Sequence, residues 1–200
     1  MLLALDATAG VCTAGLYDIA PDGSAQQVAL MAEVMDKGHA ERLFPMVEEL
    51  LASVGAEYSA LTGIAVCTGP GNFTGARIGV AAARGLALSL SIPAVGVDRF
   101  EAAAPTSGKA CVVLPGRGKS VHAACFNDGT LAGDAQTITA DDLETFANGF
   151  PVQQAEATDL DALAKVGADR LQSGDAPRPA PRYLAPANAA PPSMPPPTIL

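Results

Sequence analysis

Three glycines and one proline within the seven residues 69–75 constrain the fold of this chain more than any other stretch of its sequence. Glycine and proline interrupt strands and helices alike, so these residues predict a tight turn. The apolar run 63–68 before the turn predicts a buried strand, and the Ala- and Gly-rich run 76–90 after it predicts a helix. A strand, a glycine turn and a helix in this order indicate an α/β fold.

The same turn would direct backbone N–H groups toward the start of the helix, where phosphate groups bind in many proteins. The sequence lacks both the lysine of a P-loop and the later acidic residue of a dinucleotide motif. A phosphate site and a plain connector that lets the helix pack close to the sheet therefore both stay open. The candidate nucleotide- or phosphate-binding residues are Asp6, Thr8, Gly69, Gly71 and Thr74, although Asp6 can equally be a turn former at the end of a strand.

The composition limits the class of protein. The 200 residues are 49% hydrophobic, which is enough for one large domain or two small ones. No apolar run reaches about 18 residues and no basic segment opens the chain, so we expect a soluble, cytoplasmic protein without membrane contact. The net charge is −9 and the Lys and Arg residues are scattered, so we expect tRNA or other nucleic acid to be contacted only through a partner.

Cysteine and histidine form no metal-binding pattern in this sequence. Cys12, Cys67, Cys111 and Cys125 make no C-x-x-C pair and lie in strand-like runs, so we expect buried thiols rather than disulfides or zinc. His39 precedes a predicted helix and has no second ligand at metal spacing. The prediction is therefore that the chain binds no metal.

The remaining patterns divide the chain into two lobes and a tail. Residues 1–103 read as a first lobe, 104–174 as a smaller second lobe, and 175–200 as a proline-rich tail without a core, in which only residues 182–184 are candidates for docking on the lobes. The predicted strands are 2–6, 12–17, 26–34, 63–68, 94–97, 109–114, 120–126 and 130–138, and the predicted helices are 40–54, 74–90, 139–148 and 160–171.

Two of the predicted helices carry a surface suited to a partner. In helix 74–90, Gly75, Gly79 and Ala83 are spaced four residues apart, and a face of such small residues lets another helix approach closely. Part of this face would pack on the sheet, and we infer that the rest makes an intermolecular contact, with a homodimer when the chain is alone. The predicted contact residues on the two helices are His39, Leu43, Phe44, Val47, Leu51, Gly75, Ile78, Gly79, Ala82 and Leu86.

Five segments together resemble the TsaB family, also called YeaZ. They are residues 3–6 with Thr8, the run 39–45, the run 69–79 that reads Gly-Pro-Gly-Asn-Phe-Thr-Gly-Ala-Arg-Ile-Gly, the run 92–97, and 181–184. The resemblance is close over residues 1–103 and general beyond them. It implies an α/β fold of the actin and sugar-kinase type, with ribonuclease-H-like lobes, a mixed sheet and a reduced second lobe. The hairpin 114–122 departs from the family pattern, because an acid and an aromatic residue are missing there.

TsaB proteins are similar to TsaD, which transfers threonylcarbamoyl to adenosine in tRNA. At the positions aligned with two metal-binding histidines of TsaD, this chain carries Arg99 and Ala103, neither of which can bind a cation. The resemblance therefore implies a non-catalytic scaffold that binds and activates a TsaD-like subunit and is joined by a TsaE-like ATPase. It implies no cofactor in this chain itself, with ATP or ADP at the interface of the complex as an open alternative.

Two enzymatic functions compete with the scaffold interpretation. A small ATP-dependent kinase or phosphatase-like enzyme would use Asp6 and the glycine turn, but the sequence offers no convincing second carboxylate. A peptidase would have to draw its nucleophile and base from Cys12, Cys67 and His39, and nothing in the sequence places these residues within hydrogen-bonding reach.

Overall fold

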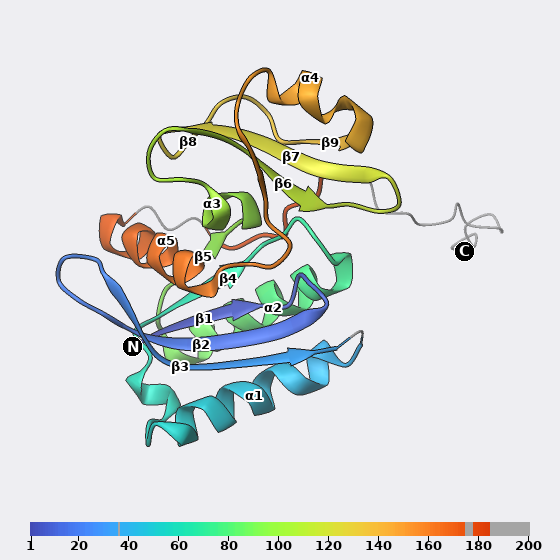
Figure 1. Cartoon of the computed structure of the whole chain (residues 1–200). Coiled ribbons are helices and arrows are strands. Elements are labelled where there is room, and N and C mark those ends of the chain that lie inside the picture. Colours follow the sequence, from blue (N-terminus) through green and yellow to red (C-terminus); the bar gives the residue numbers. More distant parts are fainter. Residues whose placement is uncertain (36, 175–177, 185–200) are drawn as a thin grey trace, which may run out of the picture.

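The computed structural model describes residues 1–35, 37–174 and 178–184. Its strands form two five-stranded sheets, which lie one above the other with helices around and between them (Figure 1). The lower sheet belongs to the first lobe and the upper sheet to the second. This arrangement confirms the predicted α/β class.

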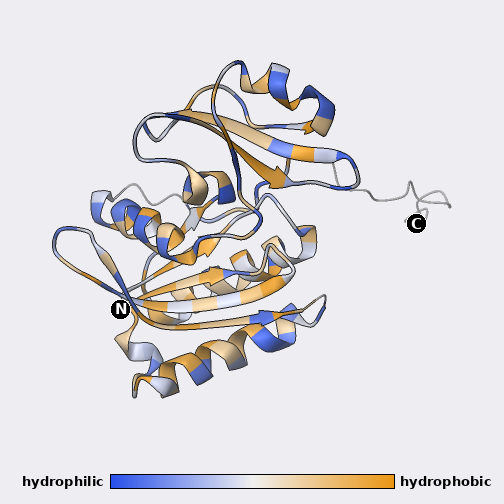
Figure 2. Ribbon diagram, viewed as in Figure 1, coloured by the Kyte–Doolittle hydropathy of each residue, from blue (hydrophilic) through white to orange (hydrophobic). Residues whose placement is uncertain are grey.

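The first sheet has the strand order β3-β2-β1-β4-β5. Its antiparallel part consists of β1 (Leu2–Asp6), β2 (Val11–Ile19) and β3 (Ala25–Val34), and its parallel part adds β4 (Gly63–Cys67) and β5 (Ala94–Val97). Every residue of β1 and β4 is buried, because both faces of the sheet are covered by helices. Figure 2 shows the resulting concentration of apolar residues along these strands.

Helices cover the two faces of the first sheet differently. On the outer face lie α1 (His39–Ser53) and α2 (Phe73–Leu90), whose buried residues share one core with Leu3, Leu5 and Ile64. On the face toward the second lobe lie α3 (Arg99–Ala103) and α5 (Leu160–Ser173), the latter over Leu2, Ala65 and Val95. The outer helices α1 and α2 therefore lie on the side of the first sheet that faces away from the second lobe (Figure 1).

The second lobe is built on β6 (Lys109–Pro115) and β7 (Ser120–Asn127), flanked by β8 (Thr130–Leu131), β9 (Gln136–Thr139) and β10 (Val152–Gln154). Short helical turns complete the fold at Tyr58–Ala60, Ala140–Asp142 and α4 (Leu143–Ala147). The predicted single strand 130–138 is wrong, because the chain leaves the sheet between β8 and β9, where Gly133 has a φ of 107°. Neither α3 nor β10 was expected from the sequence.

The predicted lobe boundaries need two corrections. Although α5 lies within 104–174, its buried residues Leu163 and Ala164 belong to the core of the first lobe, so that lobe is discontinuous in sequence. The tail docks from Pro179, which is buried, and not only over residues 182–184, where docking was expected and the amide of Arg182 donates to the Thr68 carbonyl at 2.8 Å. The remaining tail residues, 175–177 and 185–200, lie outside the described part of the chain. Among the described helices, none is long and apolar enough to span a membrane.

Candidate functional site

The glycine turn packs directly on the loop between β1 and β2. A Cβ atom on Gly75 would lie 1.7 Å from the Ala7 carbonyl oxygen, and one on Gly71 would lie 2.2 Å from that of Thr8. The amide of Asn72 donates to the same Thr8 oxygen at 2.6 Å. Glycine is therefore required here by backbone-to-backbone contact, which is the connector role predicted from the sequence.

The amide groups expected to cradle a phosphate are engaged within the chain. The side chain of Asn72 caps α2 by accepting hydrogen bonds from the amides of Thr74 (3.0 Å) and Gly75 (3.1 Å). With the Asn72 amide bonded to Thr8, three of the amides around the start of α2 already have protein partners. An anion would have to displace the cap in order to use them.

Asp6 and Thr8 form a buried local turn. Both the amide and the hydroxyl of Thr8 donate to Asp6 Oδ1, at 2.6 and 2.7 Å, and the hydroxyl also lies 3.3 Å from the Cys67 sulfur. Both residues are almost fully buried, whereas Gly71 and Thr74 are exposed. The structure thus joins Asp6 to Thr8 but does not gather the five predicted phosphate-binding residues around one open cradle; phosphate binding stays a prediction.

A cavity of about 350 Å³ lies between the β1–β3 end of the first sheet and the start of α5. Its lining includes three carboxylates, Asp6, Asp159 and Asp161, and no lysine or arginine among the residues that the structure describes. Asp159 caps α5 through the Ala162 amide, and Asp161 accepts a hydrogen bond from the Tyr17 hydroxyl at 2.8 Å. These carboxylates have structural partners, and their charge disfavours a polyphosphate in this cavity.

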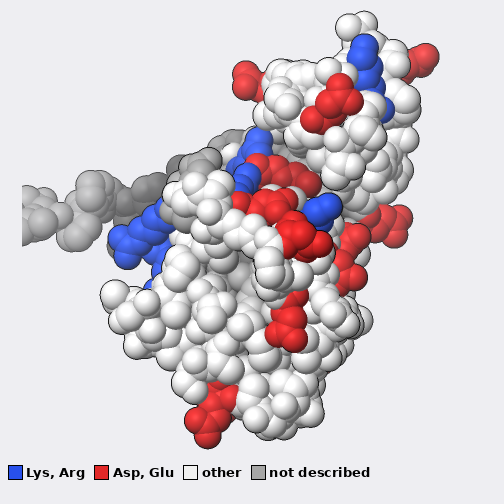
Figure 3. Space-filling view, turned by 90° about the vertical axis from the view of Figure 1, so that its left-hand side faces the viewer, with Lys and Arg blue, Asp and Glu red and all other residues white. Residues whose placement is uncertain are grey.

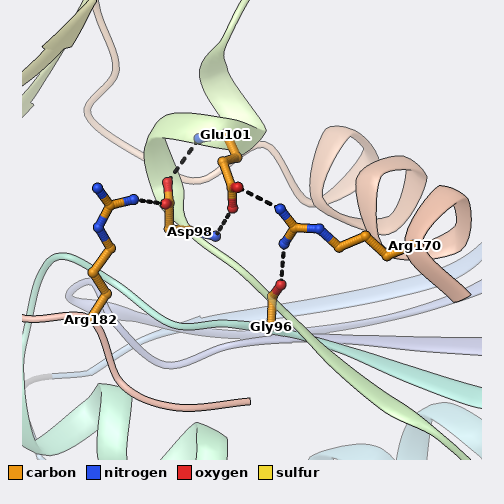
Figure 4. A network of polar contacts seen from close by, with 5 residues as sticks. All are labelled: Gly96, Asp98, Glu101, Arg170 and Arg182. Atoms are coloured by element: carbon orange, nitrogen blue, oxygen red, sulfur yellow. Dashed lines mark hydrogen bonds and ion pairs between the residues drawn. The ribbon is translucent and has the colours of Figure 1, made fainter. Parts of the chain in front are cut away.

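Two arginines pair with carboxylates in the segment from Asp98 to Ala103, for which the sequence resemblance predicted the loss of a metal-binding motif (Figure 4). Asp98 and Glu101 form a reciprocal capping box at the start of α3. Arg182 pairs with Asp98, and Arg170 from α5 pairs with Glu101 and donates to the Gly96 carbonyl. Burial raises the pKa of Asp98, the neighbouring Glu101 adds to this shift, and Arg182 opposes it.

Arg99, in the same segment, is 5% exposed. Its guanidinium donates to the Pro70 carbonyl at 3.3 Å and to the Glu156 carbonyl at 2.8 Å, while its Nε atom has no partner among the described residues. Together with burial, its charge lowers the pKa of His122 in the second lobe. Arg99 therefore links the glycine turn, through Pro70, to the segment before α5, through Glu156. Among the described residues, no group of three or more His, Cys, Asp or Glu side chains is placed to hold a metal.

The residues considered for a peptidase are not brought together. Cys12, Cys67 and His39 are all buried, and Cys67 contacts Thr8. Burial is the main cause that raises the pKa of Cys12 to about 11, and burial likewise raises the pKa of Cys67. Thiols of this kind stay protonated near neutral pH and are poor nucleophiles.

The predicted contact residues on α1 and α2 divide into two groups. Seven of them are buried in the chain's own core or at its edge and are at most about one tenth exposed: His39, Leu43, Val47, Leu51, Gly75, Gly79 and Leu86. Only Phe44, at 40%, is an exposed large apolar residue, and Ile78 and Ala82 are half-buried. The buried members stabilise this chain and cannot form the surface of a contact in this conformation, which corrects their predicted role.

A different row of α2 faces solvent. Arg77, Ala81, Gly85 and Leu88, which we call the outer stripe, are all exposed, and Leu88 is 78% exposed. Their spacing of four, four and three residues places them on one side of the helix. A Cβ atom on Gly85 would meet nothing within 4 Å. The periodicity could have revealed this stripe, but the row of Gly75, Gly79 and Ala83 looked equally suitable.

Charged side chains are unevenly distributed over the surface. In the view of Figure 3, carboxylates and a few basic groups gather at mid-height, where the two lobes meet, and the lower part of that face carries few charges. This lower part belongs to the first lobe, on the side of α1.

Comparisons with known proteins all point to one protein family. Residues 29–184 match the family model described as TsaD, tRNA N6-adenosine threonylcarbamoyltransferase. The tRNA threonylcarbamoyladenosine biosynthesis protein TsaB of Escherichia coli is 35% identical over 97 residues, which is 48% of this chain and 39% of that protein. An uncharacterized protein of Mycobacterium tuberculosis is 34% identical over 145 residues, which is 70% of this chain and 66% of that protein.

The solved structure of YeaZ from Pseudomonas aeruginosa has the same fold. It superposes with a TM-score of 0.71 at 24% sequence identity, over 92% of this chain and 99% of that one. The structural match confirms the predicted fold class, and the family model together with the TsaB relatives confirms the predicted TsaB/YeaZ resemblance. In sequence, however, the aligned part spans only about two fifths of the curated TsaB relatives from Escherichia coli and Haemophilus influenzae, namely 39% and 41% of their lengths.

Proposed function

The chain belongs to the TsaD family, in its TsaB/YeaZ branch, and from this premise we propose that it is a scaffold subunit that binds and activates a TsaD-like catalytic subunit. The TsaB relatives are named for tRNA threonylcarbamoyladenosine biosynthesis, and the proposal places this chain in that process. A TsaE-like ATPase is the further expected partner, and tRNA is contacted through the complex.

The observation that carries the proposal is the uncovered surface of α1 and α2. Both helices lie on the outer face of the first sheet. In the described chain, Ala81, Gly85 and Leu88 of the outer stripe and Phe44 on α1 are exposed, whereas Arg77 at the end of the stripe is contacted by Tyr183. Ala81 and Gly85 lack bulk, so a partner helix could approach closely between Arg77 and Leu88. An exposed apolar face of this kind is typical of a protein contact.

The segment that replaces the metal-binding motif supports a role without chemistry. Arg99 and Ala103 offer no ligand, and both nearby carboxylates, Asp98 and Glu101, are paired with arginines. Arginine pairs of this kind hold α3, α5 and the C-terminal segment in place, which is a structural task. We propose that the catalytic groups belong to the TsaD-like subunit.

The proposal is tested by measuring whether variants of this chain with substituted surface residues still bind the TsaD-like subunit. Phe44→Glu and Leu88→Glu would place a charge on the proposed contact without disturbing the core, and each should abolish co-purification with the TsaD-like subunit. Leu131→Glu is the matched control, because Leu131 is 39% exposed on the second lobe and Phe44 is 40% exposed. An unimpaired complex in the Phe44 and Leu88 variants would contradict the proposed contact.

Activity is tested by reconstitution. This chain, a TsaD-like subunit and a TsaE-like ATPase are mixed with unmodified tRNA, and threonylcarbamoyladenosine is measured by mass spectrometry. Modification should depend on this chain and be lost with Leu88→Glu. Modification or ATP hydrolysis by this chain alone would instead favour the enzymatic alternative. Size-exclusion chromatography of the isolated chain with and without Leu88→Glu tests the predicted homodimer through the same face.

A further inference from the structure

An arginine at one end of the outer stripe is held in place by two aromatic rings. The guanidinium carbon of Arg77 lies 3.8 Å from the centre of the Phe73 ring and 5.7 Å from that of Tyr183. The two rings are themselves 4.5 Å apart. Cation–π contacts of this kind fix the plane of a guanidinium group.

A hydrogen bond adds direction to this stacking. Arg77 Nε donates to the Tyr183 hydroxyl at 2.9 Å, so one edge of the guanidinium is engaged. Its two terminal nitrogens have no protein partner in the described chain, and Arg77 takes part in none of the ion pairs there. The free side of the fork therefore keeps up to four N–H donors in a fixed orientation at the surface.

The ring of Tyr183 is held from a distant part of the sequence. Next to it, Arg182 pairs with Asp98, and its amide donates to the Thr68 carbonyl, while Leu184 packs against the core of the second lobe. The segment 178–184 thus crosses the end of the first sheet and presents Tyr183 to α2. Arg77 is oriented by the C-terminal segment rather than by its own helix alone.

We propose that Arg77, oriented by Phe73 and Tyr183, receives a carboxylate of the partner protein at the end of the outer stripe; this rests on the proposed function. The free fork matches a carboxylate, which accepts two parallel N–H bonds. The side-chain entropy that an arginine normally loses on binding is reduced here, because stacking already restricts the guanidinium. A phosphate of tRNA is disfavoured as the ligand, because the chain carries a net charge of −9 and no basic cluster.

The experiment measures the affinity of the full chain for the TsaD-like subunit by isothermal titration calorimetry. Arg77→Gln should weaken binding by about tenfold or more, and Arg77→Lys should restore only part of it, since lysine has no fork. Tyr183→Phe, which keeps the ring and removes the hydroxyl, should weaken binding by about threefold. Lys165→Gln on α5 removes an equal charge from the opposite side of the first lobe and should bind like the wild type.

Salt dependence supplies a second readout. The affinity of the wild type should fall as salt rises, and that of Arg77→Gln should fall less steeply, because one charge pair is gone. Thermal unfolding of each variant checks that the fold is unchanged.

The outcomes separate this proposal from the one on which it rests. If the wild type binds the subunit and Arg77→Gln binds equally well, the carboxylate site is refuted and the scaffold function stands. If the wild type does not bind at all, both fail. If Arg77→Gln keeps its affinity for the subunit but the complex retains less tRNA, the ligand is a phosphate and the proposal is overturned.

Discussion

The two opposite sides of α2 are both built from small residues, yet they do different things. The inner row of Gly75, Gly79 and Ala83 is buried, and Gly75 touches the backbone of Ala7. The outer stripe includes Ala81 and Gly85, which face solvent. On the inner side, the small residues let α2 pack closely on the chain's own backbone. On the outer side, we propose that they let a partner protein approach the helix closely. Composition alone does not separate these two uses.

The largest expected effect contrasts the glycines of the two rows. Gly75→Ala would force a Cβ atom to within 1.7 Å of a backbone oxygen, so we expect a loss of about 3 kcal/mol or more in the free energy of unfolding. Gly85→Ala meets open space and should stabilise the helix by about 0.5 to 1 kcal/mol, because alanine is the better helix former.

Urea denaturation of both variants measures this difference. Equal changes in the two free energies would break the distinction between an inner and an outer row. A stabilised Gly85→Ala variant with weaker partner binding would sharpen it.

A similar contrast is expected between neighbouring residues of α1. Leu43 is 1% exposed, so Leu43→Ala should cost about 2 to 5 kcal/mol through the cavity it leaves. Phe44→Ala should cost about 1 kcal/mol or less, because its ring is already partly in water. Thermal and urea unfolding give both values, and a costly Phe44→Ala would show that this ring belongs to the core.

The cap of α2 has a smaller expected contribution. Asn72→Ala removes the acceptor for the amides of Thr74 and Gly75 and should cost about 1 kcal/mol. Asn72→Asp keeps an acceptor oxygen and should unfold like the wild type. If Asn72→Ala were neutral, the amides at the start of α2 would have another acceptor, and the argument against a ready phosphate cradle would weaken.

The last expected effect is a loss of stability at alkaline pH, caused by a thiol in the core beneath α1 and α2. The pKa of Cys12 is raised from 9.0 to about 11, first by burial and then by Asp6 and Glu33. Since the folded-state pKa exceeds the unfolded one, the stabilisation is complete below pH 9 and is lost as the pH rises toward 11. Free energies of unfolding measured from pH 7 to 10.5 should fall over this window, and less so for Cys12→Ala. An identical slope in Cys12→Ala would contradict the burial of this thiol.

Much of the fold was predictable because local patterns agreed with it. The apolar runs of β1, β4 and β5, the helical stripe of α1 and the glycine turn all lie where the sequence placed them. The glycine turn could be recognised because no other residue tolerates such backbone contact. The family resemblance rests on these same residues.

The sequence by itself determined that a strand, a glycine turn and a helix form the centre of an α/β lobe. Only the tertiary structure decided which row of α2 is buried, that α5 returns to the first sheet, and that Tyr183 stacks near Arg77. The reason is that periodicity shows which residues share a face of an element, whereas contacts between segments some 100 positions apart, such as the 106 residues between Arg77 and Tyr183, depend on how the whole chain packs.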